Sequence, residues 1–371
     1  MGTSPKKVNA RRKTGRRSPS TNILHAAKCR LDQFDALNRE KTLFILPVGS
    51  LEVHGYHLTN DTDMRSSLIL AEGAGGRFAA AHRDWTVVLL PLLNIGTDEL
   101  PLPGSIEFSR KTVYRALVEY ARSLERWGFR NLMITNGHGG LRHNIAIDDA
   151  CRTCNRRYRM RMISPCIRLF QDFIFGKKFR LIEAELGRKL RAPEKEGLTD
   201  LEHAGGWETS FMLNADRDLV SPNYPLLGSS RIKLGAGTIR LARFLEGIVR
   251  RVPGLRGMLS ALGMPLEEGF RFIVTAGKMY DQKKERYTYS GNPGVASPEI
   301  GRAWGAAMSR EIEAVMEGVY VTGDTQPSSV VSNHSALFFF RRDVILAATW
   351  TALALLVIAV LAGVWHAFFR S

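Results

Sequence analysis

The sequence is poor in cysteine and has no long apolar run near its N-terminus. Its four cysteines among 371 residues are too few for a disulfide framework, so we expect free thiols in a reducing compartment. The N-terminal stretch lacks the apolar centre of a secretory signal, and the chain lacks internal repeats. Disulfide-rich secreted folds and repeat architectures are therefore excluded, which leaves a globular protein with a sizeable core.

Acidic residues are absent from the first 30 positions, which carry nine Lys and Arg residues. This polar, aperiodic composition predicts a disordered basic arm over residues 1–40. The net charge of the whole chain is +16, but its apolar fraction of 44% and charged fraction of 24% are ordinary for a globular protein. A second basic stretch, residues 152–191, contains no recognised nucleic-acid-binding motif, so we expect no specific nucleic-acid partner.

Ionisable side chains are also absent from residues 344–365, a run of 22 near the C-terminus. As a helix this run would span roughly 33 Å, against a hydrocarbon core of about 30 Å. A buried core helix is the alternative, but it would need protein on all sides at the end of the chain. We therefore predict a polar linker over 322–340 and a transmembrane tail anchor over 341–371. The expected location is a cell membrane, crossed once, with the catalytic body in the cytoplasm.

Between residues 41 and 321, short apolar runs alternate with amphipathic stretches. Continuous apolar strands separated by helices are typical of a parallel sheet with helices on both faces. We predict a three-layer α/β/α fold with a mostly parallel sheet, interrupted by insertions at about 171–200 and 222–285. The predicted strands are 42–50, 86–96, 131–136 and 159–167, and the predicted helices are 64–81, 110–127, 143–158 and 297–316.

Polar side chains gather where the predicted strands end, and a parallel sheet places its ligand site at that edge. They are Glu52, His54 and Asp63 after the first strand, His138 after the third, and His203 and Glu208 in a later cluster. Carboxylates and imidazoles without thiolates suit divalent zinc, manganese or iron. A carboxylate shared between two ions would complete a dinuclear site, with the ions about 3.5–4 Å apart and a bridging hydroxide.

Each cluster taken alone has a structural explanation. A single His near a strand end is more often a hydrogen-bonded structural residue, and residues 203–210 alone could begin a helix. Three polar clusters in a core would be costly unless they were paired, so their joint occurrence favours a metal site. Cys151 and Cys154, by contrast, lie within a predicted helix and are interpreted as structural.

The three clusters resemble the motifs of the creatininase (creatinine amidohydrolase) family. That family has a strand ending in P-x-G-S/A-x-E-Q-H-G-x-H-L-P, followed by T-D, P-G-T, N-G-H-G-G-N and H-A-G-x-x-E-T-S. The match covers about 42–220 and 288–318, in the order and spacing of the family. The residues that carry it are Pro47, Gly49, Ser50, Glu52, His54, Gly55, His57, Leu58, Thr62, Asp63, Pro103, Gly104, Ser105, Asn136, Gly137, His138, Gly139, Gly140, His203, Ala204, Gly205, Glu208, Thr209 and Ser210.

The resemblance implies two divalent metal ions per subunit (Zn, Mn or Fe), held by Glu52, His54, Asp63, His138 and Glu208. Asp63 would bridge the two ions. Creatininases proper carry a further Glu ligand where this chain has Gly140, so Glu208 is expected to replace it, and Asp61 is the alternative. His203 and Glu208 are the expected catalytic residues, with His203 the proton shuttle that assists the leaving group.

The implied function is hydrolysis of a C–N amide bond in a small molecule, such as a cyclic amide or a formamide, by a metal-bridging hydroxide. Departures from the family pattern at Val53, Tyr56, Leu100 and Leu141 would reshape the pocket, so creatinine itself is not the expected substrate. The alternatives are a hydrolase of an oxidised cyclitol or keto-sugar, a peptide maturase, and a catalytically inactive membrane-bound scaffold. The resemblance further suggests a homo-oligomer, commonly of six subunits.

Overall fold

The core of the protein is a parallel β-sheet. The computed structural model describes residues 22–199, 202–251, 266–280, 288–330 and 350–351. Its sheet has six strands in the order β1–β3–β2–β5–β6, with β4 paired to β2, and all of these pairings are parallel. The strands are β1 (Ile23–His25), β2 (Thr42–Gly49), β3 (Thr86–Leu89), β4 (Leu93–Asn94), β5 (Asn131–Asn136) and β6 (Arg161–Ile163).

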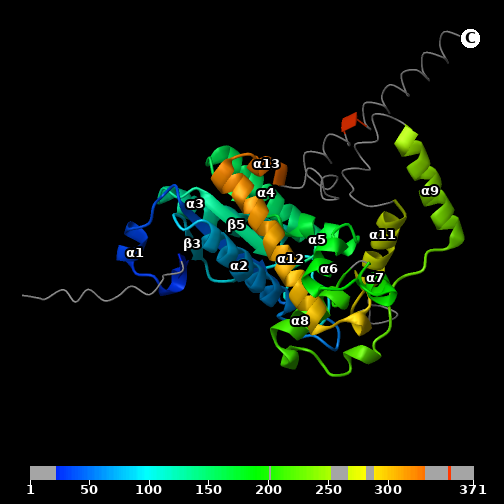
Figure 1. Ribbon diagram of the computed structural model, residues 1–371. Helices are drawn as coiled ribbons and strands as arrows, with labels where there is room; N and C mark the ends of the chain where they lie inside the picture. The colour runs from blue at the N-terminus through cyan, green and yellow to red at the C-terminus, as the bar shows by residue number, and fades with distance from the viewer. Residues whose placement is uncertain (1–21, 200–201, 252–265, 281–287, 331–349, 352–371) are drawn as a thin grey trace, which may run out of the picture.

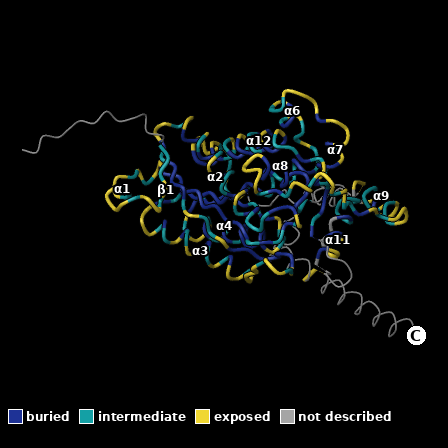
Figure 2. The backbone as a smooth tube through the Cα atoms, turned by 90° about the horizontal axis from the view of Figure 1, so that it is seen from below, coloured by how far each residue is buried: buried dark blue, intermediate teal, exposed yellow. Residues whose placement is uncertain are grey.

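Helices cover both faces of the sheet, as Figures 1 and 2 show. Seen from below, α2, α8 and α12 lie on one side of the buried strands, and α3 and α4 lie on the other (Figure 2). The predicted three-layer α/β/α fold is thus confirmed. The helices are α1 (Leu31–Asp35), α2 (Thr62–Ala81), α3 (Arg110–Arg126), α4 (Leu141–Arg157), α5 (Cys166–Ile174), α6 (Phe179–Leu186), α7 (Ala192–Leu198), α8 (Gly206–Ala215), α9 (Ala236–Arg251), α11 (Leu266–Tyr280), α12 (Pro298–Met316) and α13 (Pro327–Val330), with a π-helical turn at Glu317–Thr322.

The side chains of β2 explain why there are two helical layers. Successive side chains of a strand point to opposite faces of the sheet. Leu43 and Ile45 belong to the core shared with α2 and α12, whereas Phe44, Leu46 and Val48 belong to the core shared with α3 and α4. A strand that is apolar on both faces has to be covered on both, so the sheet lies in the middle of the molecule.

Two predicted strands are shorter in the structure than in the sequence analysis. The run 86–96 is divided into β3 and β4, and Pro91 lies in the gap, where it cannot donate a ladder hydrogen bond. The run 159–167 forms only β6, because helix α5 begins at Cys166, directly after Pro165. Pro165 fixes the chain in a helical conformation at that point (φ −82°, ψ −14°).

The expected basic arm over 1–40 extends too far into the chain. Residues 1–21 lie outside the described residues, but Ile23–His25 form β1 and pair in parallel with β3. Helix α1 follows, and Arg39 donates hydrogen bonds to the carbonyls of Phe34 and Leu37. The sheet therefore includes a strand that the sequence analysis assigned to the arm.

The expected first insertion, 171–200, contributes to the core, since Ile182 of α6 and Leu198 of α7 are fully buried against the layer that contains α12. In the expected second insertion, 222–285, α9 and α11 are joined by an ion pair between Arg243 and Glu267 at 3.3 Å. The start of the expected linker is also ordered, because the buried Val330 of α13 belongs to the same core.

The expected transmembrane tail anchor is corrected by the structure. No helix among the described residues is long and apolar enough to cross a membrane. The longest of them, α2 and α12, carry charged residues along their length. Of the apolar run 344–365, only Trp350 and Thr351 belong to the described residues, and the rest lies outside them. The anchor was inferred from the length of this run and its lack of ionisable side chains. No helix among the described residues supports it, so we withdraw the membrane attachment and the location built on it.

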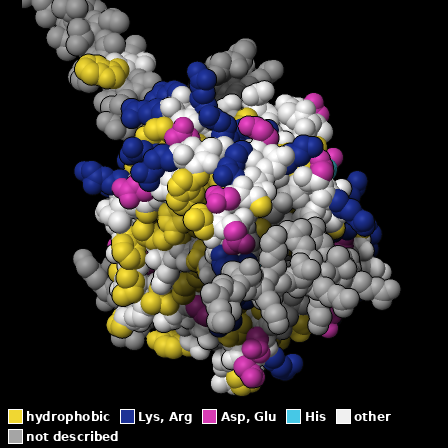
Figure 3. All heavy atoms as spheres, turned by 90° about the vertical axis from the view of Figure 1, so that its left-hand side faces the viewer, with side chains coloured by type: hydrophobic (Ala, Val, Ile, Leu, Met, Phe, Trp, Pro, Cys, Tyr) yellow, Lys and Arg dark blue, Asp and Glu magenta, His cyan; other side chains and the backbone are white. Residues whose placement is uncertain are grey.

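Charges of both signs share the surface shown in Figure 3. On this face Lys and Arg side chains lie among Asp and Glu side chains, and hydrophobic side chains gather beside them. Basic and acidic side chains are therefore interspersed on this face.

Helix α8, which carries Glu208, packs closely on α12, and Gly301 makes this contact possible. A Cβ atom at Gly301 would lie 2.5 Å from the carbonyl carbon of Ser210 and 3.0 Å from the backbone nitrogen of Phe211. Backbone atoms cannot move aside as a flexible side chain can, so any larger residue at position 301 would push the two helices apart.

We expect Gly301→Ala to destabilise the protein by about 1–3 kcal/mol, the usual cost of overpacking a core. Gly76→Ala is the matched control, since Gly76 also lies in a helix but its Cβ would meet nothing within 4 Å. It should stabilise the protein by about 0.5–1 kcal/mol through helix propensity. Urea unfolding of the two variants tests this, and equal stabilities would contradict the close contact of α8 with α12.

Candidate metal centre

The residues predicted as ligands come from the ends of two adjacent strands and from two helix N-termini. Glu52 and His54 follow β2, and Asp63 lies in the first turn of α2. His138 follows β5, and Glu208 lies in the first turn of α8. Because β2 and β5 are parallel neighbours, their carboxyl ends meet at one edge of the sheet. All five side chains are buried.

The five side chains form two triads that share Asp63. One triad is Glu52, Asp63 and His138, and the other is His54, Asp63 and Glu208, with the potential ligand atoms in each within 4.8 Å of one another. Asp63 Oδ1 lies 3.1 Å from His54 Nε2, and Asp63 Oδ2 lies 3.0 Å from His138 Nδ1. Each oxygen of one carboxylate therefore faces a different histidine.

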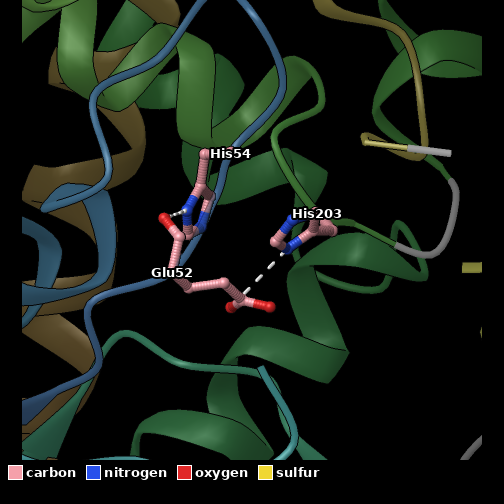
Figure 4. A group of neighbouring side chains, drawn as sticks. All are labelled: Glu52, His54 and His203. Atoms are coloured by element: carbon pink, nitrogen blue, oxygen red, sulfur yellow. Dashed lines mark hydrogen bonds and ion pairs between the residues drawn. The ribbon is translucent and has the colours of Figure 1, made fainter. Parts of the chain in front are cut away.

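The remaining carboxylates complete the two triads. Glu52 Oε2 lies 3.0 Å from His138 Nδ1, and Glu208 Oε2 lies 3.5 Å from His54 Nε2. His203 stands at the edge of the centre, with Nδ1 3.9 Å from Glu52 Oε2. Figure 4 shows the His203 ring turned toward the Glu52 carboxylate, and Glu52, His54 and His203 form a third group within ligand distance.

Hydrogen bonds to backbone carbonyls fix the tautomer of each histidine. His54 Nδ1 lies 3.0 Å from the Glu52 carbonyl, His138 Nε2 lies 3.0 Å from the Thr97 carbonyl, and His203 Nε2 lies 2.9 Å from the Val53 carbonyl. A carbonyl can only accept, so each of these ring nitrogens carries a proton. In a neutral ring the other nitrogen then presents its lone pair to the centre, which is how a histidine ligand is usually oriented by its second hydrogen bond.

The charges of the centre shift the pKa values of its members strongly. Burial lowers the pKa of His54, but the negative charges of Asp63 and Glu208 outweigh this and raise it to about 10. Burial also opposes a raised pKa at His138, but the charge of Glu52 and the hydrogen bond that the ring donates to Asp63 hold that pKa well above its usual range. Without a metal, both rings are therefore protonated at neutral pH.

Burial and neighbouring charges also shift the pKa values of Asp63, Glu208 and His203. Burial alone would raise the pKa of Asp63, but the neighbouring His54 and His138 lower it well below the ordinary value. Burial raises the pKa of Glu208 to about 7. Burial lowers the pKa of His203 to about 4, so this ring is neutral at pH 7.

Two buried atoms of the centre, Glu52 Oε2 and His54 Nε2, face only other members of it, His138 Nδ1 at 3.0 Å and Asp63 Oδ1 at 3.1 Å. Buried charged groups are costly unless they are paired, and each of these atoms belongs to a side chain whose chemistry suits a divalent ion. The donor set contains three carboxylates and two imidazoles and no thiolate, which favours zinc, manganese or iron. The residues present therefore fit a metal centre.

Position 140 has no room for the Glu that creatininases proper carry there. A Cβ atom at Gly140 would lie 2.6 Å from the Thr97 carbonyl oxygen and 2.9 Å from the Asp98 Cβ, and it would also clash with the His138 ring. The Glu208 carboxylate instead reaches the triad of His54 and Asp63 from α8. The Ala204 backbone N–H donates to its Oε2 at 2.6 Å. The structure thus brings Glu208 to the centre, as the sequence predicted.

The alternative ligand Asp61 lies apart from both triads. Its carboxylate accepts hydrogen bonds from the Thr59 hydroxyl at 2.6 Å and from Arg65 Nε at 2.5 Å. None of the groups of metal-ligating side chains found among the described residues includes it. Asp61 instead stabilises the start of α2.

The segment after β4 also belongs to the centre, and the sequence analysis missed it. The Leu100 N–H donates to Glu52 Oε1 at 2.7 Å, and the Thr97 carbonyl holds His138. Between them, Glu99 is 3% exposed, and neither of its carboxylate oxygens has a partner among the described residues. Burial raises the pKa of Glu99 to about 7. Glu99 follows the end of a strand, and this position could have identified it from the sequence. It was overlooked because the family's His is absent from this segment, where the chain has Leu100.

A pocket opens beside the centre, and two proposed ligands form part of its wall. It lies between α2, α5, α8 and α12, at the carboxyl end of β5. Its lining combines polar groups near the centre with apolar side chains farther away: Ser66, Leu70, Asn136, Gly137, His138, Gly139, Cys166, Ile167, Phe170, Glu202, Glu208, Trp304 and Met308.

Comparison with known proteins places the chain in a family. Residues 27–316 match the creatininase family, described as creatinine amidohydrolase. The fold is similar to that of a solved structure named "Creatininase Mn", with a TM-score of 0.53, 17% identity, and coverage of 81% of this chain and 99% of the other. The chain therefore belongs to the creatininase family, a family of metal-dependent amidohydrolases, and the predicted resemblance is confirmed.

Characterised relatives match over shorter stretches. The mycofactocin precursor peptide peptidase of Mycolicibacterium smegmatis is 35% identical over 99 residues, which are 26% of this chain and 40% of the relative. The creatinine amidohydrolase of Pseudomonas putida is 26% identical over 188 residues, 48% of this chain and 66% of the relative. The alignment thus spans less than half of the peptidase.

Metal binding should release protons. His54 and His138 have raised pKa values and are protonated in the metal-free protein at pH 7, whereas a ligand nitrogen has to be unprotonated. We expect about two to three protons per chain to be released at pH 7, one from each of the two rings and part of one from Glu208, whose pKa is about 7. The apparent affinity for Zn²⁺ should rise with pH up to about 10, the pKa of His54. Calorimetry in two buffers of different ionisation enthalpy measures the number of protons released on Zn²⁺ binding. Binding without proton release would mean that the histidines are neutral before the metal arrives.

Proposed function

We propose that the protein is a dinuclear metal-dependent hydrolase that cleaves a C–N amide bond in a small molecule. The observation that carries this proposal is the Asp63 carboxylate, whose two oxygens face His54 and His138 at 3.1 and 3.0 Å. A carboxylate between two triads of ligand atoms is the arrangement that a pair of metal ions requires of its bridging ligand.

The proposed ligands divide into two sets around Asp63. Glu52 and His138 would hold one ion, and His54 and Glu208 would hold the other. When bound, such a pair of ions polarises an amide carbonyl and lowers the pKa of the attacking water. The protein's side chains would hold the ions in place, exclude bulk water and transfer protons.

His203 is the proposed proton shuttle. Its ring is neutral at pH 7, so Nδ1 would accept, near Glu52, the proton that the attacking water loses as its oxygen bonds to the carbonyl carbon. Nε2 stays bonded to the Val53 carbonyl. Passing this proton to the amide nitrogen would turn the departing amide anion into a neutral amine. The antiparallel bridge between His203 and Ser290 holds the backbone of this residue in place.

A peptide bond is the second candidate substrate. The observation that favours it is the 35% identity to a mycofactocin precursor peptide peptidase. The bond and the required chemistry are the same as for a small amide, so the two candidates differ in the size of the group beside the carbonyl. We also propose that the protein forms a homo-oligomer, with six subunits as the form expected from the family resemblance.

We expect Glu208→Gln to lose one metal ion and retain the other, because Gln lacks the charge that the His54 triad supplies. Glu107→Gln is the control, since Glu107 lies near the centre but belongs to neither triad and bonds Arg142 instead. Both variants would be stripped with chelator, reloaded with Zn²⁺ or Mn²⁺ and analysed by elemental mass spectrometry. Retention of both ions in Glu208→Gln would exclude Glu208 as a ligand.

Hydrolysis would be tested on creatinine, on N-formyl amines and on short peptides with protein loaded in the same way. We expect amide hydrolysis that disappears with the chelator and falls at least about 100-fold in His203→Gln, the lower range for loss of a general acid–base group. A protein that holds two ions but hydrolyses no amide would favour the binding or scaffold interpretation over catalysis.

A further inference from the structure

Two buried histidines lie behind the proposed ligands and belong to neither triad. His57 is 4% exposed and His143 is fully buried. In each ring Nε2 is hydrogen-bonded, whereas Nδ1 has no partner among the described residues. The two residues therefore share one arrangement, although they come from different elements.

His57 contacts the segment that carries Glu208. Its Nε2 lies 2.9 Å from the Ala204 carbonyl oxygen and 3.1 Å from the Thr209 hydroxyl. Since the carbonyl only accepts, Nε2 is the protonated nitrogen and donates. The N–H of Ala204 donates in turn to Glu208 Oε2 at 2.6 Å. Ala204 has φ +51°, in the left-handed region, so its peptide needs an external contact to hold this conformation.

His143 makes the corresponding contact to the segment that carries His138. Its Nε2 lies 3.1 Å from Asn136 Oδ1. That oxygen also accepts the His138 N–H at 3.0 Å, and Asn136 Nδ2 donates to the His138 carbonyl at 2.8 Å. The edge of the His143 ring packs against the His138 ring, with centroids 5.0 Å apart. Asn136 thus makes hydrogen bonds to both the backbone N–H and the backbone carbonyl of His138, and His143 orients Asn136.

We propose that His57 and His143 are positioning residues, each serving one half of the metal centre. His57 acts through Ala204 on Glu208 and so on the triad that contains His54. His143 acts through Asn136 on His138 and so on the triad that contains Glu52. The inference rests on the proposed function, because it assigns each histidine to a different ion.

The chemistry of the two rings suits this role. Each ring is buried, donates one hydrogen bond through Nε2 and has no partner for Nδ1 among the described residues, as expected of a neutral imidazole. A neutral donor directs a loop without adding a positive charge that would repel a metal ion. Loss of such an outer contact typically lowers metal affinity about 10–100-fold.

Gln and Asn substitutions separate positioning from a general loss of structure. The amide nitrogen of Gln reaches about as far from Cα as His Nε2, whereas that of Asn is one bond shorter. Zn²⁺ titration of chelator-stripped full chain, followed by calorimetry, gives the affinity of each site. We expect His57→Asn and His143→Asn each to weaken one of the two sites about 10–100-fold. His57→Gln and His143→Gln should recover most of that affinity.

To determine which site each histidine serves, we would measure Zn²⁺ binding in a variant that retains only one of the two sites. In Glu208→Gln, where the ion held with His138 remains, a further His143→Asn should still weaken binding and a further His57→Asn should not. Thr209→Val is the matched control, because it removes the other acceptor of His57 but leaves the contact with the Ala204 carbonyl, so both sites should keep their affinity. If His57→Asn does not fold, the His143 variants still test the inference for the other site.

Three outcomes overturn the inference. It is wrong if either Asn variant weakens both sites equally, if the Gln variants recover nothing, or if His57→Asn weakens the remaining site of Glu208→Gln. If the unsubstituted protein binds two Zn²⁺ ions and one of these results is found, the inference is wrong but the proposed function is not contradicted. An unsubstituted protein that binds no Zn²⁺ would overturn the proposed function and the inference together.

Discussion

The charge of the Asp63 carboxylate has to be balanced inside the protein, because this side chain is 1% exposed. His54 balances it from the connection that follows β2, and His138 balances it from the end of β5. Removing one partner of such a buried pair typically costs about 3–5 kcal/mol, so the relative position of two strand ends depends on one acidic group. In the metal-free protein the balancing charges are protons on the imidazoles. Metal ions at the same positions would take over that role, which links the stability of the site to its function.

Backbone groups orient the side chains around this carboxylate. The Thr97 carbonyl fixes the His138 tautomer, the Leu100 N–H holds one oxygen of Glu52, and the Ala204 N–H holds one oxygen of Glu208. Backbone groups of two loops, one of which carries no proposed ligand, therefore decide where the ligands point. Only a substitution to proline removes a backbone donor, so these contacts depend less on side-chain identity than side-chain contacts do.

Much of this arrangement could be predicted from the sequence, and the reasons for the exceptions are physical. The β-branched, apolar run 42–50 and the Gly-rich turn after Asn136 have local signals, so β2, β5 and their ends were placed correctly. Strand β1 has only three residues and depends on pairing with β3, which composition cannot reveal. The crowding at Gly140 depends on a loop 40 residues away in sequence. The tail anchor was inferred from the length of the run 344–365 and its lack of charge, and no helix among the described residues supports it.

The central claim is that Asp63 bridges two metal ions, and anomalous X-ray scattering from crystals grown with Zn²⁺ tests it most directly. The account predicts two anomalous peaks per chain, one beside Glu52 and His138 and the other beside His54 and Glu208, with an oxygen of Asp63 bound to each. A single peak, or a peak that Asp63 does not contact, would contradict it.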